Sequence, residues 1–320
     1  MHIFTPSKLT KGYTEVFEQL GFQLSNQPKE IFLPFGKQSV HEFESYLNYP
    51  EVKYFLQIPD IHLFSKKTQL WMNMVNYFGL DKSLKILPQT YILNTKKDRT
   101  KLEELSQRSD LSFIAKGNQQ RRQSIKLINA SEIPELYNDS KYKLIQEIID
   151  SRNILSERAF NIRMFMIMNF SKGEFKSYIS TNGKLVHSDN DINYISDTDH
   201  YEDELPLLLI DVFSDKYALN RNKILSQLKK ICAAVSEVYI DKVDWTKFVQ
   251  EKNFCQLFGI DLIMDQDHQL KLLEINNRPQ IKSYNNRDKS FKDAIFADWI
   301  DHFLLNRNKL RLEWIQTYSY

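Results

Sequence analysis

The chain has 320 residues and a formal net charge of +2, with 42% hydrophobic and 13% aromatic residues. This composition supplies enough apolar side chains for a substantial core and argues against global disorder. The near-neutral charge argues against a nucleic-acid binder, whose positive charge is usually strong and clustered.

The two cysteines, Cys232 and Cys255, lack CxxC spacing and have no neighbouring histidine suited to a metal site. We expect both to be reduced core residues, which fits a cytoplasmic protein. The first residues have no apolar run typical of a secretory signal, and no stretch of 18 apolar residues suggests a membrane span. We therefore expect a cytoplasmic chain, acting as a monomer, with no membrane span.

The first 60 residues alternate short apolar runs with turn residues. "YTEVFEQLGFQL" predicts an amphipathic helix that ends at Gly21, and "EIFLPFG" predicts a strand closed by Pro34 and Gly36. "HEFESYLNYPEVKYFLQIPD" predicts a helix followed by extended chain. We expect residues 1–60 to form a small N-terminal α/β domain.

Residues 61–150 are predicted to form a central domain. Apolar side chains recur at helical spacing in 61–83, and Gly79 is a plausible end of that helix. A helix is predicted in "DRTKLEELSQR", and strands are predicted at 87–93, 111–117, 124–128 and 142–149.

Residues 151–320 are predicted to form the C-terminal domain. "FKSYISTNGKLVHS" predicts a hairpin that turns at Asn182-Gly183, and the acidic residues 188–205 predict a surface loop. The remaining predictions are a strand at 160–170, helices at about 217–240, 243–253 and 290–317, and a hairpin over 258–276. The alternation indicates an α/β or α+β fold with largely antiparallel sheet.

The hairpin "GIDLIMDQDHQLKLLEIN" carries acids in an apolar context. If Met264 pairs with Gln269, Asp261 faces Leu272, and side chains two residues apart share a face. Asp261, Glu274 and Asn276 then lie on one face, with the two carboxylates roughly 7–8 Å apart. Hard oxygen ligands of this kind suit Mg²⁺ bound partly by nucleotide phosphates. The pattern equally allows Glu274 to pair with a core Arg or Lys, or to face water.

The same segment resembles the last active-site hairpin of the tubulin–tyrosine ligase-like family, whose members have an ATP-grasp fold. In that family a Phe-Gly-x-Asp strand precedes a Leu-Glu-x-Asn strand. The matching residues here are Phe258 to Asp261 and Leu273 to Asn276. The resemblance assigns Asp261, Glu274 and Asn276 to Mg²⁺.

Further segments resemble the family in chain order, so that the resemblance covers about residues 60–280. "FSKKTQLWMNMVNYF" resembles a helix with a nucleotide-facing lysine, Lys67, although the adjacent Lys66 offers the same group. "FIAKGNQQRRQSIKLI" resembles the phosphate-binding hairpin with its lysine at Lys116, and "RAFNIRMFMIM" resembles the strand whose arginine, Arg163, contacts phosphate and a substrate carboxylate. The hinge whose backbone holds adenine corresponds to Gln146, Glu147, Ile148 and Ile149.

The resemblance implies ATP-dependent carboxylate–amine ligation with ATP and Mg²⁺ as cofactors. An acceptor carboxylate on a protein would take the γ-phosphoryl group as an acylphosphate, and the amine of a free amino acid such as Tyr, Glu or Gly would displace phosphate. Phosphoryl transfer depends mainly on positioning and charge neutralisation, which fits Lys67, Lys116 and Arg163 as fixed cations. Tubulin is the substrate class of the family, but nothing in this sequence shows tubulin as the acceptor.

The sequence also departs from the family pattern. The phosphate loop has no glycine after Gly117, so Arg121 and Arg122 would contribute guanidinium groups in place of backbone N–H groups, or the loop is an ordinary hairpin tip. A second arginine of the family is absent from "NGKLVHS", where Lys184 and His187 are the cationic side chains.

Two alternative functions therefore remain open. One is a nucleotide-binding ATP-grasp module without catalysis, and the other is an ATP-grasp ligase or kinase acting on a small molecule. The site residues have alternatives too. Lys116 suits a solvated surface, and Arg163 suits a buried ion pair with Glu157 or Glu174.

Overall fold

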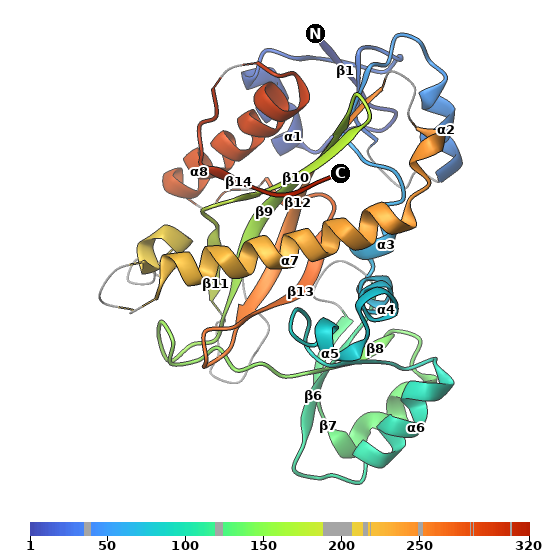
Figure 1. Ribbon diagram of the computed structural model, residues 1–320, viewed down its shortest axis with the longest axis vertical. Helices are drawn as coiled ribbons and strands as arrows, with labels where there is room; N and C mark the ends of the chain where they lie inside the picture. The colour runs from blue at the N-terminus through green and yellow to red at the C-terminus, as the bar shows by residue number, and fades with distance from the viewer. Residues whose placement is uncertain are drawn as a thin grey trace.

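The structure is a computed structural model that describes residues 1–34, 40–118, 124–187, 207–213, 217, 219–248, 252–281, 283, 285–307 and 309–320. Two β-sheets organise it: a ten-stranded sheet with helices on both faces, and a four-stranded sheet at the opposite end of the molecule (Figure 1). No helix among the described residues is long and apolar enough to cross a membrane.

The N-terminal segment contributes parallel strands to one side of the large sheet. Its strands are β1 (His2–Phe4), β2 (Gln23–Ser25), β3 (Ile31–Phe32) and β4 (Tyr54–Phe55), and its helices are α1 (Lys11–Gln19) and α2 (Val40–Leu47). The chain turns after α1 at Gly21, whose φ of 80° is in the left-handed region that favours glycine. Because β4 pairs in parallel with β12, these strands continue the sheet of the C-terminal half.

The rest of the large sheet is antiparallel and centred on β9. Its strands are β9 (Phe160–Ser171), β10 (Glu174–Ser180), β11 (Lys184–His187), β12 (Asn253–Met264), β13 (Leu270–Asn276) and β14 (Trp314–Ser319). β12 pairs along one edge of β9, whereas β10 and β11 pair one after the other along its opposite edge.

The predicted hairpin turn at Asn182-Gly183 is wrong. A two-residue hairpin turn forms instead at Lys172-Gly173, where it joins β9 to β10. Both residues have positive φ (54° and 81°), as such a turn between twisted strands requires. Gly183 serves a different purpose. A Cβ there would lie 2.1 Å from Met164 Sδ and 2.7 Å from the Arg163 carbonyl oxygen, so only glycine lets the chain rejoin β9 so closely.

Alternation along the central strands gives the sheet two buried faces. Phe258 and Ile260 of β12 pack under α3 (His62–Ser65), α4 (Lys67–Phe78) and α7 (Arg221–Lys242), the long helix that crosses the sheet in Figure 1. Cys255 and Leu257 point to the opposite face, where α1 and α8 (Asn286–Ala297) cover them. Both cysteines are free and buried, as predicted.

Two of the predicted C-terminal helices need correction. The helix predicted at 243–253 is only a 3₁₀ turn, η4 (Trp245–Lys247), and β12 begins at Asn253. The helix predicted at 290–317 consists of α8 and the π-helical turn η5 (Asp298–Leu304), after which the chain returns as β14. The buried carboxylate of Asp298 accepts hydrogen bonds from the backbone of Arg311 and Leu312 and from Trp314 Nε1, which fixes this return.

The four-stranded sheet has the order β5-β8-β6-β7 and is antiparallel throughout. Its strands are β5 (Thr90–Ile92), β6 (Ser112–Lys116), β7 (Ile125–Asn129) and β8 (Leu144–Glu147), and the elements around it are α5 (Leu80–Ser83), α6 (Lys96–Leu105) and η2 (Ala130–Asn138). A last short turn, η3 (Leu209–Val212), lies beside β11. The predicted class is confirmed as a mixed α/β fold with antiparallel sheets, flanking helices and an N-terminal α/β unit.

Candidate active site

The β12–β13 hairpin brings the predicted acids together, but in a different register from the one expected. Met264 pairs with Leu270, not with Gln269, and Asp261 lies directly opposite Glu274, not opposite Leu272. The pairing shifts by one residue next to Asp261, because a bulge at Leu273 compensates for the longer turn. The bulge therefore restores the common face that the wrong register had predicted for Asp261, Glu274 and Asn276.

Hydrogen bonds and ion pairs tie these three side chains to one another and to two cations. Asn276 Nδ2 donates to Asp261 Oδ2 and to Glu274 Oε1, each at 3.1 Å. Lys67 Nζ forms an ion pair with Glu274 Oε2. Arg163 donates through Nε and Nη2 to the two oxygens of Asp261, the bidentate geometry that suits a guanidinium group.

Two open alternatives from the sequence are thereby answered. The partner of Glu274 is Lys67, which begins α4, and Lys66 is the residue before that helix. The partner of Arg163 is Asp261, whereas Glu174 pairs with Lys176.

Strand register arranges the charged residues in one row across the sheet. Lys184 of β11 pairs with Arg163 of β9, Arg163 pairs with Asp261 of β12, and Asp261 pairs with Glu274 of β13. Cross-strand partners point to the same face of a sheet. The row therefore runs from two cations to two carboxylates and ends at Lys67 of α4.

The two facing carboxylates titrate differently. Burial raises the pKa of Asp261 above the usual carboxyl range, although the Arg163 guanidinium opposes this rise. Burial also acts to raise the pKa of Glu274, but the charge of Lys67 outweighs it and holds the pKa below its usual range. Two buried carboxylates in contact do not ionise together readily unless a cation lies close to both.

The donor set fits Mg²⁺. Two carboxylates and one carboxamide offer the hard oxygen ligands that this ion prefers, and nucleotide phosphates normally complete such a site. With the carboxamide turned so that its oxygen faces the carboxylates, Asn276 would supply the third ligand. The set contains only two carboxylates, and among the described residues no group of three or more His, Cys, Asp or Glu side chains is arranged to hold a metal ion.

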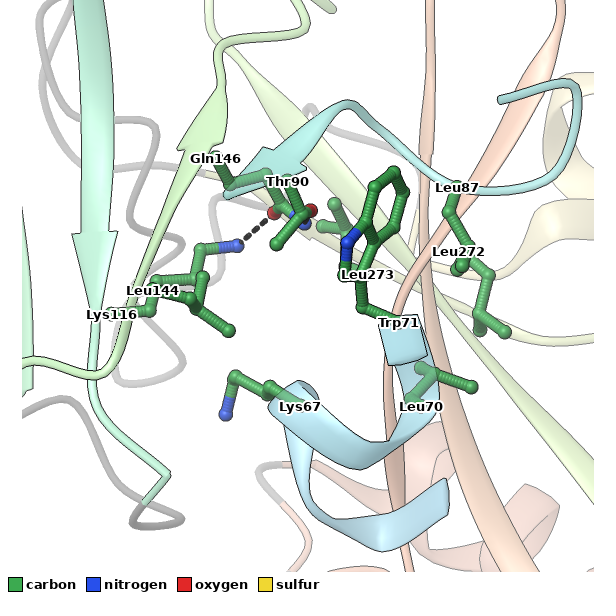
Figure 2. Close-up of a pocket in the computed structure, with 10 residues that line it drawn as sticks. All are labelled: Lys67, Leu70, Trp71, Leu87, Thr90, Lys116, Leu144, Gln146, Leu272 and Leu273. Atoms are coloured by element: carbon green, nitrogen blue, oxygen red, sulfur yellow. Dashed lines mark hydrogen bonds between the residues drawn. The ribbon is translucent and has the colours of Figure 1, made fainter. Parts of the chain in front are cut away.

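A solvent-open cavity of about 260 Å³ adjoins this row of charges (Figure 2). The cavity lies between α4 and β13 on one side and strands β5, β6 and β8 of the four-stranded sheet on the other. Its lining residues are Lys67, Leu70, Trp71, Leu87, Thr90, Lys116, Leu144, Gln146, Leu272 and Leu273. An apolar cavity with a few converging polar groups is the usual form of a small-ligand site.

A hydrogen-bonded chain fixes Lys116 at the wall of the cavity. Lys116 Nζ donates to Gln146 Oε1 at 2.5 Å, and Gln146 Nε2 donates to Thr90 Oγ1 at 2.9 Å (Figure 2). The Thr90 hydroxyl donates in turn to the Pro88 carbonyl oxygen at 3.0 Å, so its oxygen remains an acceptor for Gln146. The amide of Gln146 is thereby oriented with its oxygen toward Lys116.

Burial lowers the pKa of Lys116 to about 8, and the nearby charge of Lys67 contributes to this shift, while Glu274 and Asp261 oppose it. A buried ammonium group with a lowered pKa is stabilised by an incoming anion. The ammonium group of Lys116 therefore offers a positive charge to an anionic ligand in the cavity, such as a phosphate.

Glu147, Ile148 and Ile149, which are also predicted to bind the nucleotide, are not among the residues that line the cavity. Glu147 ends β8, and its Oε1 accepts a hydrogen bond from the Gln89 N–H at 2.7 Å. Ile148 and Ile149 follow β8 and are half-buried. Arg121 and Arg122 lie outside the described residues, as does the whole acidic segment 188–205.

Sequence reasoning missed most of the apolar wall of the cavity. Trp71 follows Lys67 by four residues and therefore shares its helical face, which is a signal that the spacing offered. Thr90 carried no such signal, because its role depends on the pairing of β5 with β8 opposite Gln146.

Comparison with known proteins finds similarity to one family. Residues 206–311 match the family model described as the tubulin-tyrosine ligase family. The chain is 24% identical over 269 residues to tubulin polyglutamylase ttll-4 of Caenorhabditis briggsae, and 22% identical over 266 residues to the protein of the same name from Caenorhabditis elegans.

Each alignment covers 75% of this chain and 44% of the relative, so the chain spans less than half the length of these curated relatives. The matched segment contains the β12–β13 hairpin with Asp261, Glu274 and Asn276. Together with the mixed α/β fold, these matches support similarity of the chain to the tubulin–tyrosine ligase-like family, from which it has diverged.

Proposed function

We propose that this protein is an ATP-dependent ligase that joins the amine of an amino acid to a carboxylate on a protein. The observation that carries the proposal is the charged row Lys184–Arg163–Asp261–Glu274, which meets Lys67 at the mouth of a cavity containing Lys116. The cavity would hold ATP, with its base against Trp71 and its phosphates toward Lys67 and Lys116. Mg²⁺, held by Asp261, Glu274 and Asn276, would neutralise charge on the phosphates.

The reaction balances without a covalent enzyme intermediate. An oxygen of the acceptor carboxylate attacks the γ-phosphorus of ATP, the bond to the β-phosphate oxygen breaks, and ADP leaves. The neutral amine of the donor then attacks the carbonyl carbon of the acylphosphate, phosphate leaves with the bonding electrons, and the nitrogen loses a proton to form the amide. Fixed cations stabilise the charge that moves in both steps, and Lys67, Lys116 and Arg163 are suited to that task.

The names of the relatives suggest a donor and an acceptor. Both are called tubulin polyglutamylases, so we propose glutamate as the donor and tubulin as the first acceptor to test. The identity of 22–24% and the partial coverage of the relatives make this the finer part of the proposal.

One observation favours a second function, nucleotide binding without ligation. Lys67 and Arg163 already pair with the two carboxylates proposed to hold Mg²⁺, and the loop after Lys116 has no glycine beyond Gly117. A scaffold stabilised by its own ion pairs would bind nucleotide weakly or without turnover.

The test is incubation of the purified protein with Mg-ATP, purified tubulin and isotope-labelled glutamate, tyrosine or glycine in separate reactions. We expect glutamate incorporation with matching ADP release, and we expect Glu274→Gln to reduce the rate at least about 100-fold, because removal of one transition-state charge partner has that effect in comparable sites. Glu135→Gln, which alters an exposed carboxylate, is the matched control and should leave the rate unchanged.

The outcomes separate the two functions. Thermal stabilisation by Mg-ATP without incorporation of any of the three amino acids supports the nucleotide-binding function and contradicts the ligase. If millimolar Mg-ATP changes neither the melting temperature nor the rate of any reaction, both functions are wrong.

A further inference from the structure

One edge of β12 changes its partner strand partway along. β4 pairs with this edge at residues 253–254, whereas β13 pairs with it at residues 259–264. β9 pairs with the opposite edge over the interval between them. Residues 255–258 therefore lie at a split, where two segments of chain diverge from the same strand. One segment leads from β4 toward Lys67, and the other continues from Asn276, the last residue of β13.

The side chain of Gln256 lies at this split and bonds to both segments. Its Oε1 accepts a hydrogen bond from the Ile58 N–H at 3.0 Å, and its Nε2 donates to the Asn277 carbonyl oxygen at 2.8 Å. Gln256 is 3% exposed, and Ile58 is fully buried. Because an N–H group only donates and a carbonyl only accepts, the two partners fix the orientation of the amide. Loss of this amide would take a hydrogen bond from each of the two backbone groups.

The first segment carries Lys67. Ile58 is followed by Pro59, whose carbonyl oxygen accepts a hydrogen bond from the Tyr239 hydroxyl at 2.7 Å. Next come α3 and then α4, which begins at Lys67. Because this stretch is short and its start is held by buried hydrogen bonds, the place of the Ile58 backbone affects that of Lys67, which forms an ion pair with Glu274.

The second segment begins at the candidate metal site, which is formed by Asp261, Glu274 and Asn276. The Asn276 side chain donates to both carboxylates of the site. The strand pairing of β13 ends at Asn276, and the bond from Gln256 holds the chain at the next residue, Asn277. A shift of the Asn277 carbonyl group would therefore move Asn276, its neighbour in the chain.

We propose that Gln256 is a positioning residue, which ties the segment of Lys67 and the segment of Asn276 to one strand and so sets the geometry of the candidate metal site. Gln256 is not among the residues that line the cavity, so it acts through these neighbours. The inference rests on the proposed function and deepens it by naming a residue behind the metal ligands. Loss of such a supporting side chain typically lowers metal affinity or activity by about 10–100-fold.

The first test uses the unaltered protein and follows amide hydrogen exchange of single residues by NMR. The Ile58 N–H should exchange slowly in the free protein, because its acceptor is a buried side chain. Mg-ATP should slow the exchange of Ile58 together with that of residues 274–278, although Ile58 does not line the cavity. Fast exchange of Ile58 in the free protein overturns the inference, and so does protection of 274–278 without any change at Ile58.

The second test removes the amide. Gln256→Met keeps the length of the side chain and loses both hydrogen bonds. Thr317→Val is the matched control, because the buried Thr317 hydroxyl bonds to the Ser177 hydroxyl at 2.7 Å between β14 and β10, two strands away from β12. Electron paramagnetic resonance measures the binding of Mn²⁺ in the presence of ATP. We expect Gln256→Met to bind Mn²⁺ at least about tenfold more weakly than the unaltered protein, and Thr317→Val to bind it equally well.

In the ligase assay, the same change should raise the Mg²⁺ concentration for half-maximal rate and leave KM for glutamate unchanged. If Gln256→Met loses thermal stability as Thr317→Val does but binds Mn²⁺ normally, the amide only supports the fold, which overturns the inference and leaves the ligase intact.

The remaining outcomes separate the inference from the proposed function. If ligation fails while Mn²⁺ and ATP still bind, the Mn²⁺ affinities decide the inference, because binding requires no turnover. If Gln256→Met does not fold, the exchange comparison in the unaltered protein decides it. If the unaltered protein binds neither Mn²⁺ nor ATP, the proposed function and the inference are both wrong.

Discussion

At the scale of single residues, Lys116 shows how the site depends on protonation. Its ammonium group lies within the cavity wall, where it donates to the neutral side-chain oxygen of Gln146, Oε1. Burial lowers its pKa to about 8, so a phosphate ligand would bind the protonated form. The lysine is therefore expected to favour binding at neutral pH and to lose that effect in mildly alkaline solution.

We predict that the affinity for Mg-ATP falls as the pH rises through about 8. Gln146→Leu removes the hydrogen-bond acceptor of the ammonium group and should shift this fall to lower pH. Isothermal titration between pH 6.5 and 9.5 measures the effect, and Lys116→Met serves as the control whose affinity should lack this step. An identical pH dependence in the unaltered protein and in Lys116→Met would contradict the prediction.

The same lysine affects folding with the opposite sign. Its pKa is lower in the folded protein than in the unfolded chain, so the unfolded chain binds more protons between about pH 8 and its ordinary pKa of about 10.4. Without nucleotide, the contribution of Lys116 to the free energy of unfolding should therefore rise over this interval. Urea unfolding at pH 8 and pH 9.5 tests this as the difference between the unaltered protein and Lys116→Met, which cancels the titration of other groups.

At the scale of secondary-structure elements, close approach of chain segments decides how the site is built. β11 rejoins β9 at Lys184 immediately after Gly183, and this junction brings Lys184 beside Arg163. The bulge at Leu273 does the same for Glu274 and Asp261 on the other side of the row. Both irregularities place charged side chains on a common face, as bulges beside active sites often do.

We predict that Gly183→Ala is more damaging than Gly173→Ala. The first change drives a methyl group into Met164 and the Arg163 backbone, so we expect a loss of about 2–3 kcal/mol in unfolding free energy and a large fall in activity. The second places alanine at a φ of 81° in open space, which should cost about 1–2 kcal/mol without moving Arg163. Urea unfolding and ligase rates of the two variants make the comparison, and equal losses of activity would contradict it.

The return of the chain after η5 depends on another buried group. Asp298 is fully buried and accepts three hydrogen bonds from residues 311–314. Asp298→Ala leaves these donors without their acceptor, so we expect a loss of about 3–5 kcal/mol in unfolding free energy and faster hydrogen exchange in β14. Asp293→Ala, at a partly exposed position paired with Lys289, is the control and should change stability by less than about 1 kcal/mol.

At the scale of the whole molecule, the candidate nucleotide cavity joins the two sheets. α4 and β13 supply one wall from the large body, and β5, β6 and β8 supply the other from the four-stranded sheet. The two sheets lie at opposite ends of the molecule, with α4 and α5 between them (Figure 1). A ligand in the cavity would therefore contact both bodies.

We predict that Mg-ATP stabilises the protein and slows amide exchange in β6 and β8 as well as in β13. A ligand at 100 times its Kd adds about 2.7 kcal/mol to the free energy of unfolding by mass action. Glu274→Gln should lose the part of this stabilisation that depends on Mg²⁺. Exchange measured by mass spectrometry, with and without Mg-ATP, tests the prediction, and protection confined to one of the two bodies would contradict it.

Local patterns in the sequence were enough to predict the fold class and most of the helices and strands, whereas the common face of Asp261, Glu274 and Asn276 was predicted from a register that the structure corrects. Hydrophobic periodicity and glycine positions are local properties, so 61–83 was identified as helical with Gly79 as its end, which the structure bears out. The Asn182-Gly183 dipeptide is a local signal for a hairpin turn, but β10 and β11 on either side of it both pair with β9. The local signal therefore gave a wrong prediction where long-range strand pairing prevailed.

The partners of the charged residues, in contrast, depend on long-range packing. Lys67 meets Glu274, Arg163 meets Asp261, and Lys184 meets Asp288 across separations of about 100 residues or more. The strand register also corrected the pairing of Asp261 and revealed Lys292 beside Lys184. Such contacts depend on how distant strands and helices pack, because the energy that selects them comes from burial and pairing of groups that no local pattern relates.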